Sequence, residues 1–205
     1  MRYEVWENLA KKYNNLWVQK YSLGPTRREV KKIIIPFLKK NHNLKILDIG
    51  CGTGQLISEV NKEVPVKNYL GIDVAENMIK IAIQNNEQHL KFKSCSIEKF
   101  NSKDKFDIVI CTHSFPYFPN KEDVLKKIFN LCNKNAKFII VNSSTNSLKD
   151  LIINFFLKAT TSEAKYLSIK HTKKLLVSAN FTVQDVQIIR ERFYMPTIAL
   201  FYVKR

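Results

Sequence analysis

Blocks of apolar residues alternate with segments of helical period along most of the chain. Short, continuous apolar runs predict buried strands at 45–49, 68–73, 106–111 and 137–142, with a shorter strand at about 90–96. Between these runs, apolar positions at helical spacing predict helices at 54–63, 75–86 and 121–132. Continuously apolar strands are typical of parallel sheets that are buried on both faces. The alternation therefore predicts an α/β fold with a mostly parallel sheet covered by helices on both faces.

Two of these helices carry further signals. Helix 75–86 is predicted to bury one face, formed by Met78, Ile79, Ala82 and Ile83. Helix 121–132 is predicted to begin after Asn120, which caps it, with Asp123 at the third helical position.

The segment before the first strand predicts two helices. A helix over 3–21 is indicated by apolar residues at helical spacing, namely Trp6, Leu9, Tyr13 and Trp17. The pair Gly24-Pro25 is expected to break this helix, and Thr26 to cap a second one. Pro36 lies inside the second pattern and is expected to kink or end that helix.

The segment after Asn142 predicts two helices and two strands. The first helix begins at Ser147 and runs to about 158, with Asp150 in its first turn. The second is expected to be capped by Thr172 and to end near Asn180, because asparagine tolerates the left-handed conformation found at helix ends. Two further apolar runs, 181–190 and 195–204, predict a terminal strand pair.

The loop after strand 45–49 is the most informative part of the chain. It reads Asp48-Ile49-Gly50-Cys51-Gly52-Thr53-Gly54, so that three of the chain's five glycines lie within five residues. Glycine loses more backbone entropy on folding than any other residue, so such a cluster needs a reason. A strand–loop–helix turn with few side chains lets the backbone lie against a ligand. A glycine-rich turn without a ligand is the alternative interpretation.

Charge and cysteine content narrow the possible partners. The net charge is +16, which is compatible with a nucleic-acid partner. Only six of the 34 basic residues are arginines, the residue best suited to phosphate, so we interpret the dispersed lysine excess as compositional bias. The four cysteines form no C-x-x-C pair, and we expect core positions for them and no metal site.

Length and hydropathy favour one domain in the cytoplasm. We expect a single domain over 1–205, divided into an N-terminal cap (1–24), a cofactor-binding half (25–142) and a substrate-side part (143–205). The start of the chain does not resemble a signal peptide, and no apolar run is long enough to span a bilayer. We therefore expect no membrane partner and leave monomer or homodimer open.

The pattern D-x-G-x-G-x-G formed by Asp48, Gly50, Gly52 and Gly54 resembles motif I of the class I S-adenosylmethionine-dependent methyltransferases. The dinucleotide fingerprint G-x-G-x-x-G would need a glycine where Gln55 stands, so a nicotinamide oxidoreductase is disfavoured. The resemblance covers roughly residues 25–205. It implies a Rossmann-like, doubly wound sheet of seven strands whose last strand is antiparallel, with an N-terminal helical cap.

The resemblance also implies where S-adenosyl-L-methionine binds. The glycine loop passes under its amino acid and ribose part, and Asp73 at the end of strand 68–73 accepts the ribose hydroxyls; an ordinary helix cap is the alternative role for Asp73. Ser96 stands where relatives often carry an aspartate for the adenine amine, and Val74 and Ile97 pack near the ring. The expected cofactor-binding residues are Asp48, Gly50, Cys51, Gly52, Gly54, Asp73, Val74, Met78, Ser96, Ile97, Cys111 and Tyr13.

The substrate side is expected in the aromatic segment after strand 106–111 and in the N-terminal helix. In the family this segment touches both cofactor and substrate, and His113 is its candidate general base, with simple packing as the alternative. Tyr21, Phe115 and Tyr117 are the candidate substrate-binding residues, and Tyr13 resembles a tyrosine on a helical lid. The run Ser114-Phe115-Pro116-Tyr117 slightly resembles the signature of amino methyltransferases, from which it departs at Phe115.

These features predict a methyltransferase that transfers a methyl group in line to an oxygen, nitrogen or carbon atom of a small molecule. Two alternatives remain. The charge allows an RNA methyltransferase, and the glycine loop alone allows a protein that binds S-adenosylmethionine without catalysis.

Overall fold

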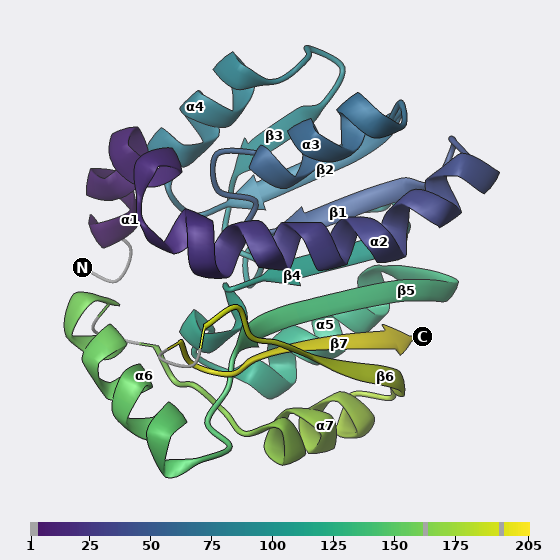
Figure 1. Cartoon of the computed structure of the whole chain (residues 1–205). Helices are drawn as coiled ribbons and strands as arrows, with labels where there is room; N and C mark the ends of the chain where they lie inside the picture. The colour runs from purple at the N-terminus through teal and green to yellow at the C-terminus, as the bar shows by residue number, and fades with distance from the viewer. Residues whose placement is uncertain (1–3, 162–163, 193–194) are drawn as a thin grey trace.

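The computed structural model describes residues 4–161, 164–192 and 195–205. One seven-stranded sheet runs through the molecule in the order β3-β2-β1-β4-β5-β7-β6 (Figure 1). Neighbouring strands from β3 to β5 are parallel, and β7 is antiparallel to both of its neighbours. The strands are β1 (Lys45–Ile49), β2 (Asn68–Asp73), β3 (Lys91–Ser94), β4 (Phe106–Thr112), β5 (Cys132–Ser143), β6 (Thr182–Ile189) and β7 (Ile198–Lys204). The predicted sheet with its antiparallel last strand is confirmed.

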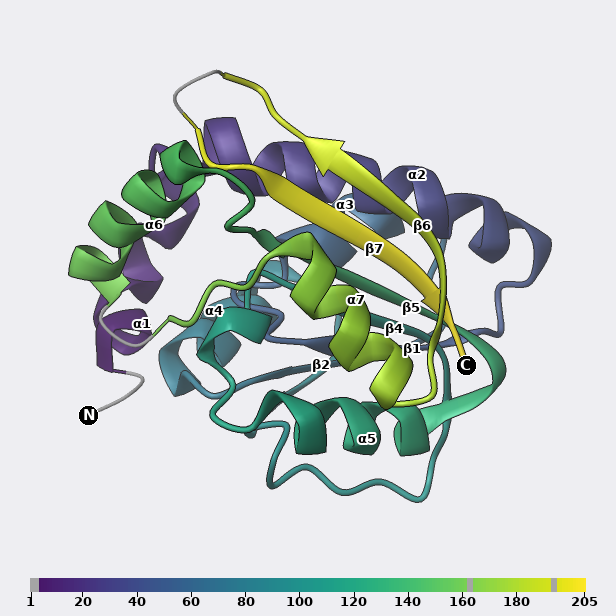
Figure 2. The same ribbon diagram turned by 90° about the horizontal axis from the view of Figure 1, so that it is seen from below.

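Helices cover both faces of the sheet because its strands present apolar side chains in both directions. On one face, α2 and α3 pack on a cluster that includes Ile46 and Ile108. On the other, α5 and α7 pack on a cluster that includes Leu47 and Val109 (Figures 1 and 2). The α-helices are α1 (Glu4–Leu9), α2 (Gly24–Lys40), α3 (Gln55–Glu63), α4 (Glu76–Asn85), α5 (Lys121–Leu131), α6 (Leu148–Thr161) and α7 (Ile169–Ser178).

The N-terminal segment differs from the single helix predicted over 3–21. After α1 it continues as a 3-10 helix, η1 (Ala10–Asn15), and a π-helix, η2 (Gln19–Leu23). Gly24 and Pro25 do not break a helix but begin α2, where proline is tolerated because the first helical N–H groups have no helical acceptor. Thr26 is a buried residue inside α2 and not its cap.

Further predictions about helix ends and faces were wrong in detail. Of the two outcomes expected for Pro36, a kink or an end of the helix, the end is wrong: α2 continues to Lys40, and residues such as Ile35 and Leu38 bury its apolar face on both sides of the proline. Ser168, not Thr172, caps α7. Ile83 is 57% exposed and does not share the buried face of α4. The cap of α5 by Asn120, which accepts a hydrogen bond from the N–H of Asp123, is confirmed.

A short 3-10 helix, η3 (Phe115–Tyr117), follows β4. Both views place α1 and α6 at the end of the molecule where the parallel strands finish (Figures 1 and 2). Within the described residues, none of the helices combines the length and the apolar character that crossing a bilayer requires.

Candidate functional site

The site lies where the sheet changes direction. From β1, the chain builds outward through β2 and β3 on one side and through β4 and β5 on the other. Ligands of doubly wound proteins bind at this switch point, beside the carboxyl ends of the strands. The glycine loop after β1, the residues after β2 and the segment after β4 meet there around two adjoining cavities.

Each glycine of the loop has a left-handed backbone, but the space around them differs. The φ angles are 74° at Gly50, 55° at Gly52 and 74° at Gly54. A Cβ on Gly50 would lie 1.8 Å from Oγ of Ser114, and one on Gly54 would lie 2.7 Å from Nδ2 of Asn86. On Gly52 the nearest atom would be a Tyr13 ring carbon at 3.6 Å. Packing therefore demands glycine at position 50, whereas a Cβ on Gly54 would require the side chains of Asn86 and Phe92 to move, and the side of Gly52 has room for a Cβ.

Asp73 joins the loop to the end of β2. Its Oδ2 accepts the N–H of Gly52 at 2.9 Å, and its Oδ1 accepts the N–H of Ala75 at 2.9 Å. Burial raises the pKa of Asp73, while these backbone N–H groups oppose the rise. Each oxygen has a second lone pair with which it can accept a hydroxyl of a ligand.

Helix α4 is capped by Glu7, a residue that the sequence analysis did not identify. Ala75 is the N-cap of α4, so Asp73 is not its ordinary cap. Instead, the Glu7 carboxylate from α1 accepts the N–H groups of Glu76 at 2.6 Å and Asn77 at 2.9 Å. This contact fixes the N-terminal segment over the site, and no local pattern around α4 predicts it.

The larger cavity encloses about 730 Å³, including its open mouth. Its walls are largely apolar and aromatic, and Trp6 stacks edge to face on Tyr117, with ring centroids 5.5 Å apart. The cavity is lined by Trp6, Tyr13, Ile49, Gly50, Gly52, Ile72, Asp73, Val74, Met78, Cys95, Ile97, Glu98, Thr112, His113, Ser114, Tyr117 and Phe118.

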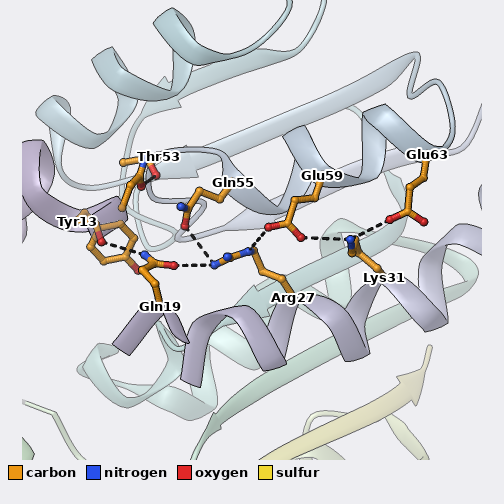
Figure 3. A network of polar contacts seen from close by, with 9 residues as sticks. Tyr13, Gln19, Arg27, Lys31, Thr53, Gln55, Glu59 and Glu63 are labelled. Atoms are coloured by element: carbon orange, nitrogen blue, oxygen red, sulfur yellow. Dashed lines mark hydrogen bonds and ion pairs between the residues drawn. The ribbon is translucent and has the colours of Figure 1, made fainter. Parts of the chain in front are cut away.

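The smaller cavity, of about 420 Å³, is more polar. Arg27 of α2 lines this cavity. Figure 3 shows its guanidinium among the side chains of Gln19, Gln55 and Glu59. Its Nε donates to Oε1 of Glu59 at 2.7 Å, and its Nη1 donates to Oε1 of Gln19 at 2.8 Å and of Gln55 at 3.1 Å. The neighbouring Lys31 forms ion pairs with both Glu59 and Glu63, and these contacts extend the network along α2 and α3 (Figure 3). Arg27 is thus a cation held in a defined orientation.

Asp48 faces the same smaller cavity from β1. It is only 2% exposed, and within the described part of the chain its Oδ1 has no hydrogen-bond partner. Its Oδ2 accepts the hydroxyl of Tyr69 at 3.2 Å. Burial raises the pKa of Asp48 to about 7, a rise that the Tyr69 hydrogen bond opposes and the charge of Asp73 increases. An orphaned buried oxygen is costly unless a ligand supplies its donor.

His113 lines both cavities. Its backbone is left-handed, with φ of 59°, and its N–H donates to the carbonyl of Val141 at 2.7 Å. Nε2 of the ring lies 2.9 Å from Oγ1 of Thr26. Burial, followed by the charge of Arg27, lowers the pKa of His113 to about 4. The imidazole is therefore neutral at physiological pH.

The structure brings most of the sequence-predicted site residues together. Those that line the larger cavity are Tyr13, Gly50, Gly52, Asp73, Val74, Met78, Ile97, His113 and Tyr117. Asp48 and Cys51 line the smaller one.

Five predicted residues line neither cavity. Gly54 packs against Asn86 and Phe92, and Cys111 and Phe115 belong to the hydrophobic core. Ser96 starts a turn, in which its Oγ accepts the N–H of Lys99. Tyr21 lies in η2 under the guanidinium of Arg192, 6.0 Å from the ring centroid.

Some lining residues were not predicted. Trp6 was named only as an apolar position of the predicted helix 3–21, and Glu98 was not singled out, although both line the larger cavity. The position of Glu98 one residue after Ile97 was the available signal, since the loop after β3 was already expected near the ligand.

The model of the methyltransferase domain family matches residues 40–193. Malonyl-[acyl-carrier protein] O-methyltransferase of Bacillus cereus is 26% identical over 126 residues, which are 59% of this chain and 47% of that protein. The ubiquinone/menaquinone biosynthesis C-methyltransferase UbiE of Wigglesworthia glossinidia brevipalpis is 28% identical over 69% of this chain and 58% of that one. The chain therefore spans about half the length of these curated relatives.

Solved methyltransferases share the fold. The plantazolicin methyltransferase BpumL, in complex with a triazolic desmethylPZN analog and SAH, superposes with a TM-score of 0.74 at 17% identity, over 97% of this chain and 90% of that one. Magnesium protoporphyrin IX methyltransferase from Synechocystis PCC 6803 with bound SAM gives 0.67 at 17% identity, over 92% and 84%. With more than half of its length matched by the family model, the chain belongs to the methyltransferase domain family, the class I S-adenosylmethionine-dependent methyltransferases.

Proposed function

We propose that the chain holds S-adenosylmethionine across the two cavities and transfers its methyl group to a small-molecule acceptor. One observation carries the proposal: the Asp73 carboxylate, braced by the N–H of Gly52, stands in an aromatic-walled cavity beside the open side of that glycine. When bound, S-adenosylmethionine supplies a methyl group on a positively charged sulfur. The chain's own residues then have to orient the reactants and exclude water.

The larger cavity suits the adenosine part. The free lone pairs of Asp73 suit two neighbouring ribose hydroxyls, and a carboxylate there disfavours a ligand with a phosphate on the ribose. Val74, Met78 and Ile97 supply apolar surface for the adenine ring.

The smaller cavity suits the amino acid part, because it offers one group of each sign. The unpartnered Oδ1 of Asp48 is a ready acceptor for an ammonium group. The guanidinium of Arg27 suits a carboxylate. A zwitterion in this cavity would supply the hydrogen-bond donor that Asp48 lacks, so the residues present fit the group.

We propose that placement, and not proton abstraction, is the main contribution of His113. A pKa of about 4 makes its imidazole a weak base at neutral pH, because general bases work best with a pKa near the working pH. The contact with Thr26 and the backbone bond to Val141 hold the ring between the two cavities. A neutral ring there avoids adding a second cation beside Arg27.

The acceptor side is formed by Trp6, Tyr117 and Phe118, whose rings favour a flat or apolar molecule. The alternative acceptor is RNA, which the net charge of +16 supports. The lysines that produce this charge are dispersed along the chain, so the small-molecule acceptor remains our proposal.

Calorimetry with S-adenosylhomocysteine tests the cofactor site. Asp73→Ala removes the carboxylate, and we expect at least about a tenfold loss of affinity, or about 1.4 kcal/mol, which is roughly the net contribution of one hydrogen bond. Asp185→Ala is the matched control, because Asp185 is an exposed acid on β6 that lines neither cavity. Equal affinities of Asp73→Ala and the wild type, with both folded, would overturn the assignment.

The acceptor class is tested separately with methyl-labelled S-adenosylmethionine and a cell extract divided into RNA, protein and small-molecule pools. Label in the small-molecule pool supports the proposal, and label in the RNA pool supports the alternative. Labelling of none of the pools by protein that binds S-adenosylhomocysteine would favour the third hypothesis, a binding protein without catalysis.

A further inference from the structure

Among its described residues, helix α6 (Leu148–Thr161) turns polar side chains toward the protein and apolar side chains toward solvent. Its inward residues among those described are polar: Asp150 is 1% exposed and Asn154 is 2% exposed. The two lie four residues apart and therefore share one side of the helix. A helix on the surface of a globular protein ordinarily turns its apolar side inward.

Polar contacts fix the orientation of α6. Asp150 accepts the N–H of Thr197 at 2.9 Å on Oδ1 and the N–H of Asn146 at 3.2 Å on Oδ2. Asn154 accepts the hydroxyl of Ser143 at 2.6 Å and donates to the carbonyl of Ser144 at 3.2 Å. These bonds tie the helix to the end of β5 and to the residue before β7. The outward face is therefore a defined surface.

That outward face is apolar. Its exposed fractions are 76% at Leu148, 59% at Leu151, 50% at Ile152 and 68% at Phe155. The spacing i, i+3, i+4 and i+7 places these four residues, here called the α6 stripe, on one side of the helix. Among the described residues, the other large apolar side chains with high exposure are Trp17, Ile83, Val177 and Ile188, and each lies on a different segment of the chain. Single exposed residues are normal, but a contiguous apolar stripe marks a contact surface.

The charge around α6 indicates what that surface meets. Helix α6 itself contains two lysines, Lys149 and Lys158, and a single acidic residue, Asp150, which is buried and hydrogen-bonded. The whole chain carries +16, so a second copy would bring the same positive field to the stripe and be repelled. An anionic lipid surface complements both features, because apolar side chains enter the headgroup region while lysines attract the lipid charge.

We infer that α6 is an interfacial helix that docks the chain on an anionic lipid surface through the α6 stripe, which departs from the sequence-based expectation of no membrane partner. The helix lies on the surface and does not cross it, in keeping with the lack of a spanning helix among the described residues. The segment that follows α6 is joined to the site, since the N–H of Lys165 donates to the carbonyl of Pro116 at 2.8 Å, next to Tyr117 in the cavity wall. Docking requires no methyl transfer and is independent of the proposed function.

Vesicle sedimentation with the full chain tests this inference. The probes are vesicles of phosphatidylcholine alone and vesicles in which about a third of the lipid is phosphatidylglycerol, at about 0.1 M salt. We expect binding to the anionic vesicles and little binding to the neutral ones. The double variant Leu151→Ser/Ile152→Ser is expected to lose at least about tenfold in partitioning, because two apolar side chains no longer enter the headgroup region.

The matched control is Ile83→Ser, which removes an equally exposed apolar side chain from α4. We expect this variant to bind as the wild type does. Lys149→Glu is expected to weaken binding to anionic vesicles only, since it reverses one charge on α6. Thermal unfolding checks that all variants fold. We expect them to fold, because substitutions at exposed positions usually change stability little.

Three results would overturn the inference. The first is no binding of the wild type to anionic vesicles. The second is equal binding of wild type and the Leu151→Ser/Ile152→Ser variant, which would reduce the effect to charge alone. The third is a concentration-dependent dimer that this variant loses, measured by light scattering, because the occupant would then be a second copy.

Discussion

The glycine loop and helix α6 lie at the same end of the molecule but are held in place by opposite means. The loop follows β1, whose apolar side chains are buried on both faces of the sheet, and backbone bonds fix its course. Helix α6 turns polar side chains inward and leaves the α6 stripe outside. Apolar burial gives a segment stability and position together, whereas polar anchors give position with little stability.

The largest expected effect falls on the loop, where Gly50→Ala should destabilise the fold by about 2–4 kcal/mol. Its Cβ would meet Oγ of Ser114 at 1.8 Å and Cβ of Ser114 at 2.6 Å, so rotation of the serine does not relieve the clash. Urea unfolding measures this loss. In a Ser114→Gly background, we expect only the cost of roughly 1 kcal/mol for a left-handed alanine.

The matched variant Gly52→Ala separates the effect of the loop on stability from its effect on ligand affinity. Its new methyl group has room, with the Tyr13 ring 3.6 Å away, so the stability loss should be confined to roughly 1 kcal/mol of backbone strain. The methyl group faces the cavity, however, and we expect about a tenfold loss of S-adenosylhomocysteine affinity. An affinity loss at Gly52 no greater than its stability loss would mean that the loop serves the fold alone.

Asp48 is expected to make binding depend on pH. The free carboxyl has a pKa of about 7, and an ammonium group binds its ionised form, so affinity should fall as the pH falls below about 7 and level off above it. His113, with a pKa of about 4, does not titrate in this window. Calorimetry between pH 6 and 8 measures the slope, and Asp48→Asn should abolish it. A slope retained in Asp48→Asn would assign the titration to another group.

The same substitution should stabilise the protein without ligand. Because burial raises the pKa of Asp48 above its unfolded value, its contribution to stability is greatest at low pH and is lost as the pH rises through about 7. Asp48→Asn removes the buried charge, so we expect a gain of about 1–3 kcal/mol at pH 8 and little gain at pH 5. Thermal unfolding at the two pH values measures this difference, and an equal change at both would contradict it.

The contrast between the loop and α6 also explains which parts of the fold and of the site could be predicted from the sequence. Strands such as 68–73 were predicted to the residue, because buried parallel strands need continuous apolar runs. Asp73 and Gly52 were predicted to meet a ligand from the resemblance, and both line a cavity. Contacts between distant segments were not predicted: neither the capping of α4 by Glu7 nor the bond of Thr26 to His113 has a local pattern.

Helix α6 shows a second limit. Its existence was predicted, but its orientation was not, because a helical period does not say which side faces inward. Polar residues at Asp150 and Asn154 would ordinarily be assigned to solvent. Only the tertiary partners Ser143 and Thr197 turn them inward. The opposite error concerns Phe115, which was predicted to bind substrate but is buried in the hydrophobic core.

Asn154→Ala should loosen α6 with little effect on the rest of the molecule. It removes the bonds to Ser143 and Ser144, and among the residues of α6 whose side chains are described, the other buried one is the polar Asp150. We expect a loss of about 1–2 kcal/mol in local stability, seen as faster amide hydrogen exchange in α6. Exchange in β1 and β4 serves as the control and should stay within a factor of about two. Equal acceleration throughout the sheet would show that α6 is part of the cooperative core.

The smallest effect is expected on the α6 stripe itself. Leu151→Ser without lipid should change the free energy of unfolding by no more than about 0.5 kcal/mol, because the leucine is 59% exposed. Leu47→Ser on β1, at 0% exposure, should cost several kcal/mol, since it leaves a cavity and a buried hydroxyl. Urea unfolding of both variants measures the ratio. A large loss at Leu151 would mean that its side chain packs against the protein in solution, and the stripe would then stabilise the fold instead of being reserved for a surface outside it.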